Sequence, residues 1–228
     1  MIAALFVDPR GVYSGLDNVE CWGVERDARL YDGPWSVVAH PPCERWGRMW
    51  FGSPRKPDPE KYRLGDDGGC FASALASVRR WGGVIEHPEA SEAWEAHGLV
   101  APPRGGGWVA ADWPMHDGWT CCVEQGHYGH LGRKATWLYA VRCEMPSLRW
   151  GSSGQRLDPV LLYTRGYEYA RRCGITGMVG GKWKKRQRGA TPPAFRDVLL
   201  AMARSVRKQD LLKRLPSEVC FSSDGLCE

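Results

Sequence analysis

A short apolar run that ends in two prolines and a cysteine constrains this chain more than any other feature. Residues 35–46 read WSVVAHPPCERW. The segment 36–39 predicts a buried strand, because small and β-branched residues favour strands. Pro41 and Pro42 cannot donate to a β-ladder, so the strand ends and a rigid turn places Cys43 beyond its carboxyl end. Ligands bind at that edge of open parallel sheets. Cys43 is therefore either a nucleophile or a small buried residue, and the motif alone favours neither.

The order of short apolar strands and amphipathic helices predicts the fold class. The segment 69–81 places Phe71, Leu75 and Val78 on one helical face, and an apolar strand follows it after two glycines. A helix followed by a short strand is the rhythm of a parallel sheet, so we predict an α/β fold with a mostly parallel sheet flanked by helices. The predicted strands are 2–7, 19–24, 36–39, 84–88, 118–124 and 135–142, and the predicted helices are 69–81, 91–98 and 194–206.

The length of the chain suits one domain. Of its 228 residues, 43% are hydrophobic and 25% are charged, which is ordinary for a globular protein. We assign residues 1–206 to a single α/β domain, with a loop-rich region that faces nucleic acid at about 144–190, and residues 207–228 to a tail.

The start of the chain and its cysteines predict a compartment. No basic segment followed by a long apolar run is present, so we predict no signal peptide, no membrane span and a cytoplasmic location. The nine cysteines include no Cys-x-x-Cys pair. We therefore predict reduced thiols and no structural metal.

The charge distribution permits a polyanionic partner but does not require one. The net charge is +5, and the loop 44–67 interleaves cations with aromatic residues, a pattern that suits the backbone and bases of a nucleic acid. The segment 182–188 is a dense basic run that suits phosphate contacts. The same two segments could also be a solvated loop and a solvated charge run. The predicted nucleic-acid-binding residues are Arg45, Trp46, Arg48, Lys134, Lys182, Lys184, Lys185, Arg186 and Arg188.

Further polar residues follow other predicted strands. Glu86 lies at the end of the strand 84–88, and it shares one crevice with Cys43 if that strand neighbours 36–39; otherwise it is a solvated carboxylate. Gly11 lies in the first turn and Glu25 follows the second strand. Such positions approach a nucleotide cofactor in doubly wound folds, while the residues themselves favour a solvated loop charge for Glu25.

Five segments, taken in order, resemble the DNA cytosine-5 methyltransferase family. Pro42-Cys43 resembles the Pro-Cys that follows a strand in that family, and Glu86-His87-Pro88 is similar to its Glu-Asn-Val strand end. The other three are 5–11, similar to the cofactor loop, 128–134, similar to the Tyr-Gly…Gln-x-Arg-x-Arg segment, and 189–193, similar to the Gly-Asn-x-Val-Pro-Pro helix start. The family's Phe-x-Gly-x-Gly is absent, and His87 replaces the asparagine.

The resemblance implies a Rossmann-like methyltransferase fold and transfer of a one-carbon unit to carbon 5 of cytosine in DNA. It implies that Cys43 adds to carbon 6 of the base, that Glu86 protonates the ring nitrogen, and that Arg133 steadies the base or a flanking phosphate. The base must be flipped out of the stack or presented single-stranded. We expect Arg45 and Arg48 to lower the pKa of the thiol.

The resemblance also implies a cofactor. The standard donor of the family is S-adenosylmethionine, and the residues that would bind it here are Phe6, Asp8, Gly11, Glu25 and Pro41. The altered cofactor loop leaves methylenetetrahydrofolate, and therefore hydroxymethylation, as a variant. The residues also permit the same chemistry on a free pyrimidine nucleotide, and they permit a non-catalytic protein that binds nucleic acid.

Overall fold

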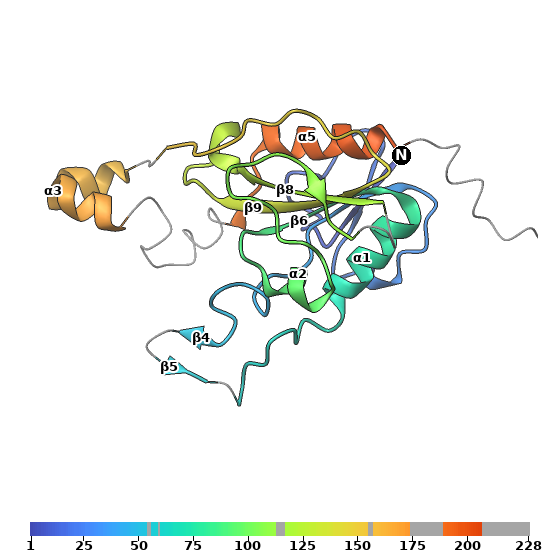
Figure 1. The fold of residues 1–228 in the computed structure, drawn as a ribbon, viewed down its shortest axis with the longest axis horizontal. Helices are drawn as coiled ribbons and strands as arrows, with labels where there is room; N and C mark the ends of the chain where they lie inside the picture. The colour runs from blue at the N-terminus through green and yellow to red at the C-terminus, as the bar shows by residue number, and fades with distance from the viewer. Residues whose placement is uncertain (54–55, 59, 113–116, 155–156, 174–188, 207–228) are drawn as a thin grey trace, which may run out of the picture.

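The chain folds around one mixed sheet. The structure, a computed structural model, describes residues 1–53, 56–58, 60–112, 117–154, 157–173 and 189–206. Within these residues seven strands form a sheet in the order β2-β1-β3-β6-β9-β8-β7 (Figure 1). The strands are β1 (Ile2–Leu5), β2 (Val19–Trp22), β3 (Ser36–Ala39), β6 (Gly83–Pro88), β7 (Val109–Ala110), β8 (Gly118–Glu124) and β9 (Ala135–Val141).

The predicted Rossmann-like fold, with a mostly parallel sheet flanked by helices, is wrong. The strands β2, β1, β3 and β6 pair in parallel, but the two longest ladders, β6–β9 and β8–β9, are antiparallel, as is β7–β8. The described helices are few, and the connections from β1 to β2 and from β2 to β3 contain no α-helix. The prediction failed because the helix–strand order of residues 70–88 was extended to segments that lack a helical apolar period.

The mixed directions still bring several strand ends together. Both β6 and β8 pair antiparallel with β9, so β6 and β8 run in the same direction. The carboxyl ends of β1, β3, β6 and β8 therefore lie at the same edge of the sheet. This edge receives the residues that follow each of these strands.

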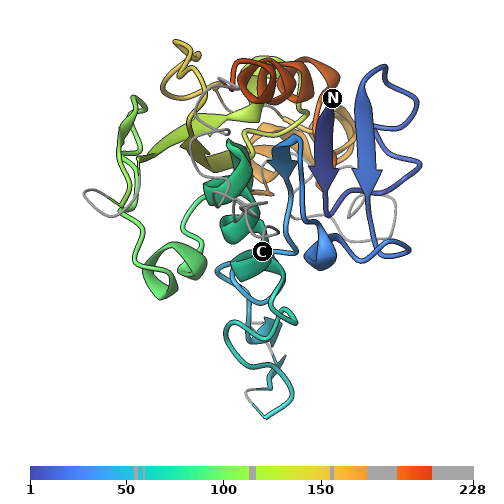
Figure 2. The ribbon, with the colours of Figure 1, turned by 90° about the vertical axis from the view of Figure 1, so that its right-hand side faces the viewer.

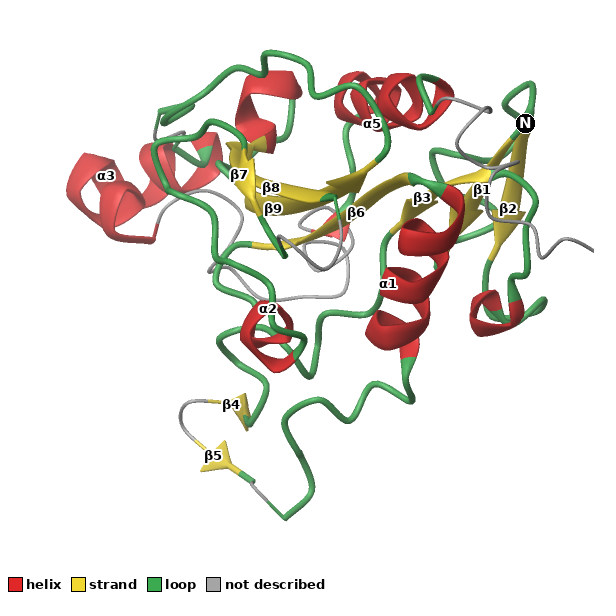
Figure 3. Cartoon of the chain, turned by 45° about the vertical axis from the view of Figure 1, so that its right-hand side comes forward, coloured by secondary structure: helices red, strands yellow, loops and turns green. Residues whose placement is uncertain are grey.

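The few described helices that contact the sheet lie on opposite faces of it (Figure 3). The α-helices of the described residues are α1 (Cys70–Trp81), α2 (Glu92–Ala96), α3 (Pro159–Cys173) and α5 (Pro193–Arg204), and two 3₁₀ turns are η1 (Ala28–Leu30) and η2 (Gln125–Tyr128). Helices α1 and α2 pack on one face with Leu5 and Ile85, and α5 packs on the other with Ala4 and Val84. The alternation of neighbouring strand residues between two cores follows from the two-residue period of a strand. Helix α3 projects from the body (Figure 1).

Local sequence signals explain the helix ends. The predicted face of α1 is confirmed, because Phe71, Leu75 and Val78 are buried. Ser91 caps α2 by accepting a hydrogen bond from the backbone N–H of Ala93. Pro192 occupies the N-cap position of α5 and makes no side-chain capping bond.

The segment between β3 and α1 leaves the body of the molecule. It contains a small antiparallel hairpin, β4 (Gly52–Ser53) and β5 (Lys56–Pro57), which protrudes below the sheet (Figure 2). The backbone N–H of Gly65 donates to the carbonyl of Arg45 over 3.0 Å. The outward and returning parts of the excursion are therefore joined at its base.

None of the helices in the described ranges has the length and apolar character that a bilayer span requires. The predicted tail 207–228 and the part of the predicted nucleic-acid-facing region at 174–188 lie outside the described residues.

Candidate functional site

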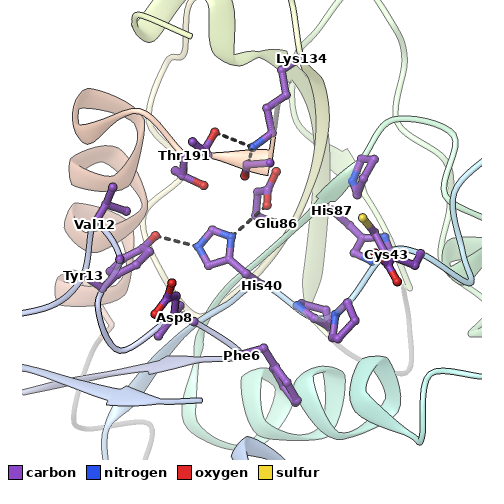
Figure 4. A pocket seen from close by; sticks show the side chains of 18 of the residues that line it. Phe6, Asp8, Val12, Tyr13, His40, Cys43, Glu86, His87, Lys134 and Thr191 are labelled. Carbon is purple, nitrogen blue, oxygen red and sulfur yellow. Dashed lines mark hydrogen bonds and ion pairs between the residues drawn. The ribbon is translucent and has the colours of Figure 1, made fainter. Parts of the chain in front are cut away.

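A cavity of about 1020 Å³ opens at the edge where the parallel strands end (Figure 4). Its lining comes from chain segments that are far apart in the sequence: 6–8, 10–13, 40–44, 86–88, 134–135 and 189–191. Each of the five segments that carry the family resemblance contributes to this lining. The structure thus brings together residues that the sequence related only by their order.

Cys43 and Glu86 both line this cavity. Cys43 follows β3 and Glu86 lies near the end of β6, and these two strands pair in parallel as neighbours. The ladder extends one residue past β3, because the backbone N–H of His40 donates to the carbonyl of Leu5 over 3.0 Å. Pro41 and Pro42 follow at once, so the thiol lies just beyond the sheet edge, as the sequence predicts.

The thiol of Cys43 is held in its neutral form. Burial raises the pKa of Cys43, the charge of Glu86 raises it further, and Lys134 partly offsets these effects. The expectation that Arg45 and Arg48 lower this pKa is wrong. The guanidinium of Arg45 lies over the ring of Tyr62 at 4.2 Å, and Arg48 forms an ion pair with Glu89.

Glu86 is a buried carboxylate with both oxygens engaged. Oε2 lies 2.9 Å from Nδ1 of His40, and Oε1 accepts a hydrogen bond of 2.8 Å from Nε2 of Gln125. Burial alone would raise the pKa of Glu86, but the positive charge of Lys134 and the contacts with His40 outweigh it and lower the pKa to about 2. Glu86 is therefore ionised at neutral pH.

His40 connects Glu86 to a buried tyrosine. The hydroxyl of Tyr13 lies 2.7 Å from Nε2 of His40, and the two rings are 5.3 Å apart at their centroids. Burial raises the pKa of Tyr13 well above its usual value, so its hydroxyl keeps its proton. Tyr13, His40 and Glu86 form a continuous hydrogen-bonded line along the cavity wall (Figure 4).

Lys134 closes another side of the cavity. Its Nζ donates to the carbonyls of Gly189 and Ala190, over 3.2 and 3.0 Å, and so ties the start of β9 to the approach of α5. Lys134 and Phe6 both have positive φ values, 40° and 59°, which are uncommon for residues with side chains. Strained backbone of this kind concentrates at functional sites, and here both residues line the same cavity.

The predicted cofactor residues fall into two groups. Phe6, Asp8, Gly11 and Pro41 line the cavity, whereas Glu25 is exposed and lies outside its lining. A Cβ atom at Gly11 would lie 2.9 Å from the carbonyl oxygen of Asp8. The glycine therefore serves the tight turn itself, and it does not leave a space that a ligand would fill.

The predicted nucleic-acid-binding residues are also separated. Trp46 is 7% exposed, packs against Phe71 and donates from Nε1 to Asp67, so its ring has no free face for a base. Arg48 is exposed on the excursion between β3 and α1, and Arg45 is half-buried beside it. Lys134 belongs to the cavity. Five predicted residues lie outside the described residues: Lys182, Lys184, Lys185, Arg186 and Arg188.

Arg133 does not line the cavity. Its guanidinium forms an ion pair with Glu124 at the end of β8, and Ser153 donates to the same carboxylate from its backbone and its hydroxyl. The structure therefore places Arg133 in a surface cluster beside the cavity, where it holds the β8–β9 connection to residue 153. Across the described ranges, no three His, Cys, Asp or Glu side chains gather in a way that could hold a metal ion.

Sequence reasoning missed three polar residues of the site. Tyr13, His40 and Gln125 make the hydrogen bonds that fix Glu86 or its partner. His40 directly precedes the two prolines of the Pro-Pro-Cys segment, and Gln125 directly follows the strand β8. Their positions at strand ends were a usable signal, because carboxyl ends of strands that run in the same direction share an edge.

No family model matches the chain, and comparisons with curated proteins and with solved structures gave no match either.

Proposed function

We propose that this protein modifies cytosine in DNA at carbon 5, by one-carbon transfer through a covalent adduct with Cys43. The observation that carries the proposal is the convergence of five segments on one cavity, with the Cys43 thiol and the Glu86 carboxylate both in its wall. The resemblance to the cytosine-5 methyltransferases concerns these same five segments. If the likeness were due to chance, there would be no reason for segments spread over residues 5 to 193 to line the same cavity.

The chemistry explains why a thiol and a carboxylate are needed at one base. Carbon 5 of cytosine is a poor nucleophile until the sulfur of Cys43 bonds to carbon 6 and ring nitrogen N3 gains a proton. The electron pair of the 5,6 double bond then becomes available at carbon 5. After transfer, carbon 5 loses its proton to water, the bond between carbon 6 and sulfur breaks, and N3 gives back the proton that it gained, which restores the neutral ring and the thiolate.

The protonation states in the cavity refine the role of Glu86. Because the pKa of Glu86 is low and that of Cys43 is raised, the proton of the free site lies on sulfur and not on the carboxyl group. Glu86 in this form accepts a hydrogen bond from the exocyclic amino group of cytosine. It must receive a proton from a neighbour before it can pass one to N3.

The cavity has room for a donor beside the base. Its volume of about 1020 Å³ lies at the upper end of the usual range for pockets that hold a drug-sized ligand. Phe6, Asp8 and Pro41 would hold S-adenosylmethionine, which would supply the methyl group as an electrophile. Glu25 lies away from the cavity and is not placed to accept the ribose hydroxyls. This gap favours a folate-type donor, and hence hydroxymethylation, as the second candidate.

The mass of nucleosides from DNA of cells that express the chain tests the proposal. The matched control is the Cys43→Ser variant, which changes one atom of the proposed nucleophile. We expect deoxycytidine that is heavier by one methyl group, and only with the wild-type chain. A hydroxymethyl group would identify the folate-type donor. Unchanged deoxycytidine, from a folded protein that binds DNA, would overturn the proposal in favour of a non-catalytic nucleic-acid-binding protein.

A further inference from the structure

A hydrogen-bonded line runs from Tyr13 through His40 to Glu86, and two of its members, Tyr13 and His40, lie outside the set of residues that the family resemblance supplies. Both contacts are short, 2.7 Å from Tyr13 Oη to His40 Nε2 and 2.9 Å from His40 Nδ1 to Glu86 Oε2. The side chains of His40 and Glu86 are 14% and 10% exposed. The pair is therefore largely desolvated, yet it still reaches the cavity.

The donors and acceptors of this line follow from its chemistry. An ionised Glu86 only accepts, so Nδ1 of His40 carries a proton toward it. Tyr13 can donate its hydroxyl proton to Nε2 when the imidazole is neutral. It can also accept from Nε2 when the imidazole is doubly protonated. Tyr13 therefore satisfies Nε2 in both charge states of His40, an arrangement that suits a histidine whose charge changes during a reaction.

Positioning of Glu86 does not require this histidine. Gln125 is fully buried and fixes Oε1 of the carboxylate, and Thr136 supports it through a 2.9 Å bond from Gln125 Nε2. A second anchor of fixed charge would serve if positioning were the only need. A titratable group at Oε2 adds the one property that Gln125 lacks, which is a transferable proton.

We propose that His40 is the proton store of the site, and that its Nδ1 proton passes through Glu86 to ring nitrogen N3 as Cys43 adds to carbon 6. This inference rests on the proposed function. Before addition, the thiol of Cys43 gives its proton to water in the cavity and His40 takes one up from water. During addition, Glu86 receives the Nδ1 proton of His40 and passes it on to N3, which restores the carboxylate. His40 is then neutral, with its one proton on Nε2 donated to Tyr13, and proton exchange with water returns it to the tautomer that donates from Nδ1 to Glu86.

Several charged and titratable groups act on this line from the elements packed against it. They are Asp8 in the turn after β1, Cys43 after β3, Glu86 and His87 in β6, Lys134 before β9, and Arg196 and Asp197 in α5, with Cys21 of β2 acting on Tyr13. Substitution of any of them shifts the pH dependence, so the test varies His40 and Tyr13 alone.

The test uses release of tritium from carbon 5 of deoxycytidine in random-sequence duplex DNA, with no donor present. Addition of Cys43 makes carbon 5 basic, so it exchanges its hydrogen with water without any transfer of a carbon unit. His40→Asn keeps an amide N–H that can donate to Glu86 but cannot titrate. We expect its release rate to fall by about 100-fold or more, the usual range for loss of a general acid–base group. His127→Asn is the matched control, because His127 contacts the carbonyl of Gly151, away from the cavity.

The pH profile separates proton storage from positioning. In the wild type the active form holds one proton between Cys43 and His40, so the release rate rises and then falls with increasing pH. In His40→Asn only Cys43 titrates, and the rate rises without a later fall. In Tyr13→Phe the imidazole loses a hydrogen-bond partner in both charge states but can still exchange protons, so the bell shape is kept.

The outcomes distinguish the two proposals. A wild-type chain that releases no tritium would count against the proposed function itself. A wild type that releases tritium, together with a folded His40→Asn that keeps both the rate and the bell-shaped profile, would overturn the role of His40 and leave the proposed function standing.

Discussion

Gln125 donates a hydrogen bond of 2.8 Å from Nε2 to Oε1 of Glu86, from a strand end 39 residues further along the chain. The bond exists because β6 and β8 run in the same direction on either side of β9. It fixes one oxygen of the carboxylate and leaves the other to His40. Both the acid stability of the protein and its proposed activity should therefore depend on the charge state of this carboxylate.

Substitution of the proposed nucleophile should abolish the chemistry and leave the fold intact. Cys43→Ser replaces a half-buried thiol by a hydroxyl of similar shape, and we expect neither tritium release from carbon 5 nor modified deoxycytidine. Cys70→Ser is the matched control, since Cys70 is equally half-buried but begins α1, outside the cavity. Activity in folded Cys43→Ser would rule out Cys43 as the nucleophile.

Glu86 should make the protein sensitive to strong acid. The pKa of Glu86 is about 2 in the folded chain and 4.5 in the unfolded reference, so its contribution to stability is present above pH 4.5 and is lost as the pH falls toward 2. The full effect is on the order of 3 kcal/mol. Urea unfolding at a series of pH values should show this decline in the wild type and not in Glu86→Gln. An identical decline in both proteins would show that other carboxylates cause it.

His87 should make the stability of the protein depend on pH in a less acidic range than the one in which Glu86 acts. Burial lowers the pKa of His87 from 6.5 to about 4, and the charge of Glu86 offsets only part of this shift. The unfolded chain therefore binds a proton before the folded chain does, and stability declines as the pH falls from 6.5 to 4, by on the order of 3 kcal/mol. His87→Asn should remove this slope from the free energy of unfolding, while His127→Asn should keep it. A slope retained in His87→Asn would contradict the prediction.

Substitutions of the adjacent residues Lys134 and Arg133 should differ in their effects on tritium release and on acid stability. Lys134→Met removes the positive charge that contributes most to stabilising ionised Glu86, so the pKa of Glu86 rises. The free energy of unfolding then begins to fall at a higher pH, and we expect slower tritium release. Arg133→Met breaks an ion pair between an exposed arginine and the buried carboxylate of Glu124, which keeps its hydrogen bonds from Ser153, and we expect a loss of stability on the order of 1–3 kcal/mol. We expect its tritium release to stay within twofold of the wild type. A large loss in Arg133→Met would restore the role that the resemblance implies for this residue.

The sequence predicts most local elements correctly, and the reasons are physical. The strand 36–39 and its abrupt end follow from β-branched residues next to two prolines, and α1 follows from Phe71, Leu75 and Val78 at helical spacing. These signals depend only on neighbours in the chain. The direction in which β9 pairs with β6 depends on residues 48 to 58 positions apart, and no local pattern reports it.

Some residues of the candidate site can likewise be predicted from local sequence, and others cannot. Cys43 and Glu86 are found from sequence because each ends a recognisable strand. The hydrogen bonds of His40 and Gln125 depend on which strands become neighbours, so they emerge only from the folded chain. Trp46 shows the converse error: its place among arginines suggests an exposed ring, but the indole is packed into the core against Phe71.

The hydrogen bond from Gly65 to Arg45 has a consequence for how this protein can vary. It joins the two ends of the segment between β3 and α1, which starts right after Cys43. The residues between Arg45 and Gly65 therefore form an insertion whose base is fixed to the body of the molecule. Insertions, deletions or replacement of this insertion would change the outer surface of the molecule, while the edge of the sheet keeps its structure. Under the proposed function, the chemistry at the sheet edge and the choice of target could therefore be changed independently.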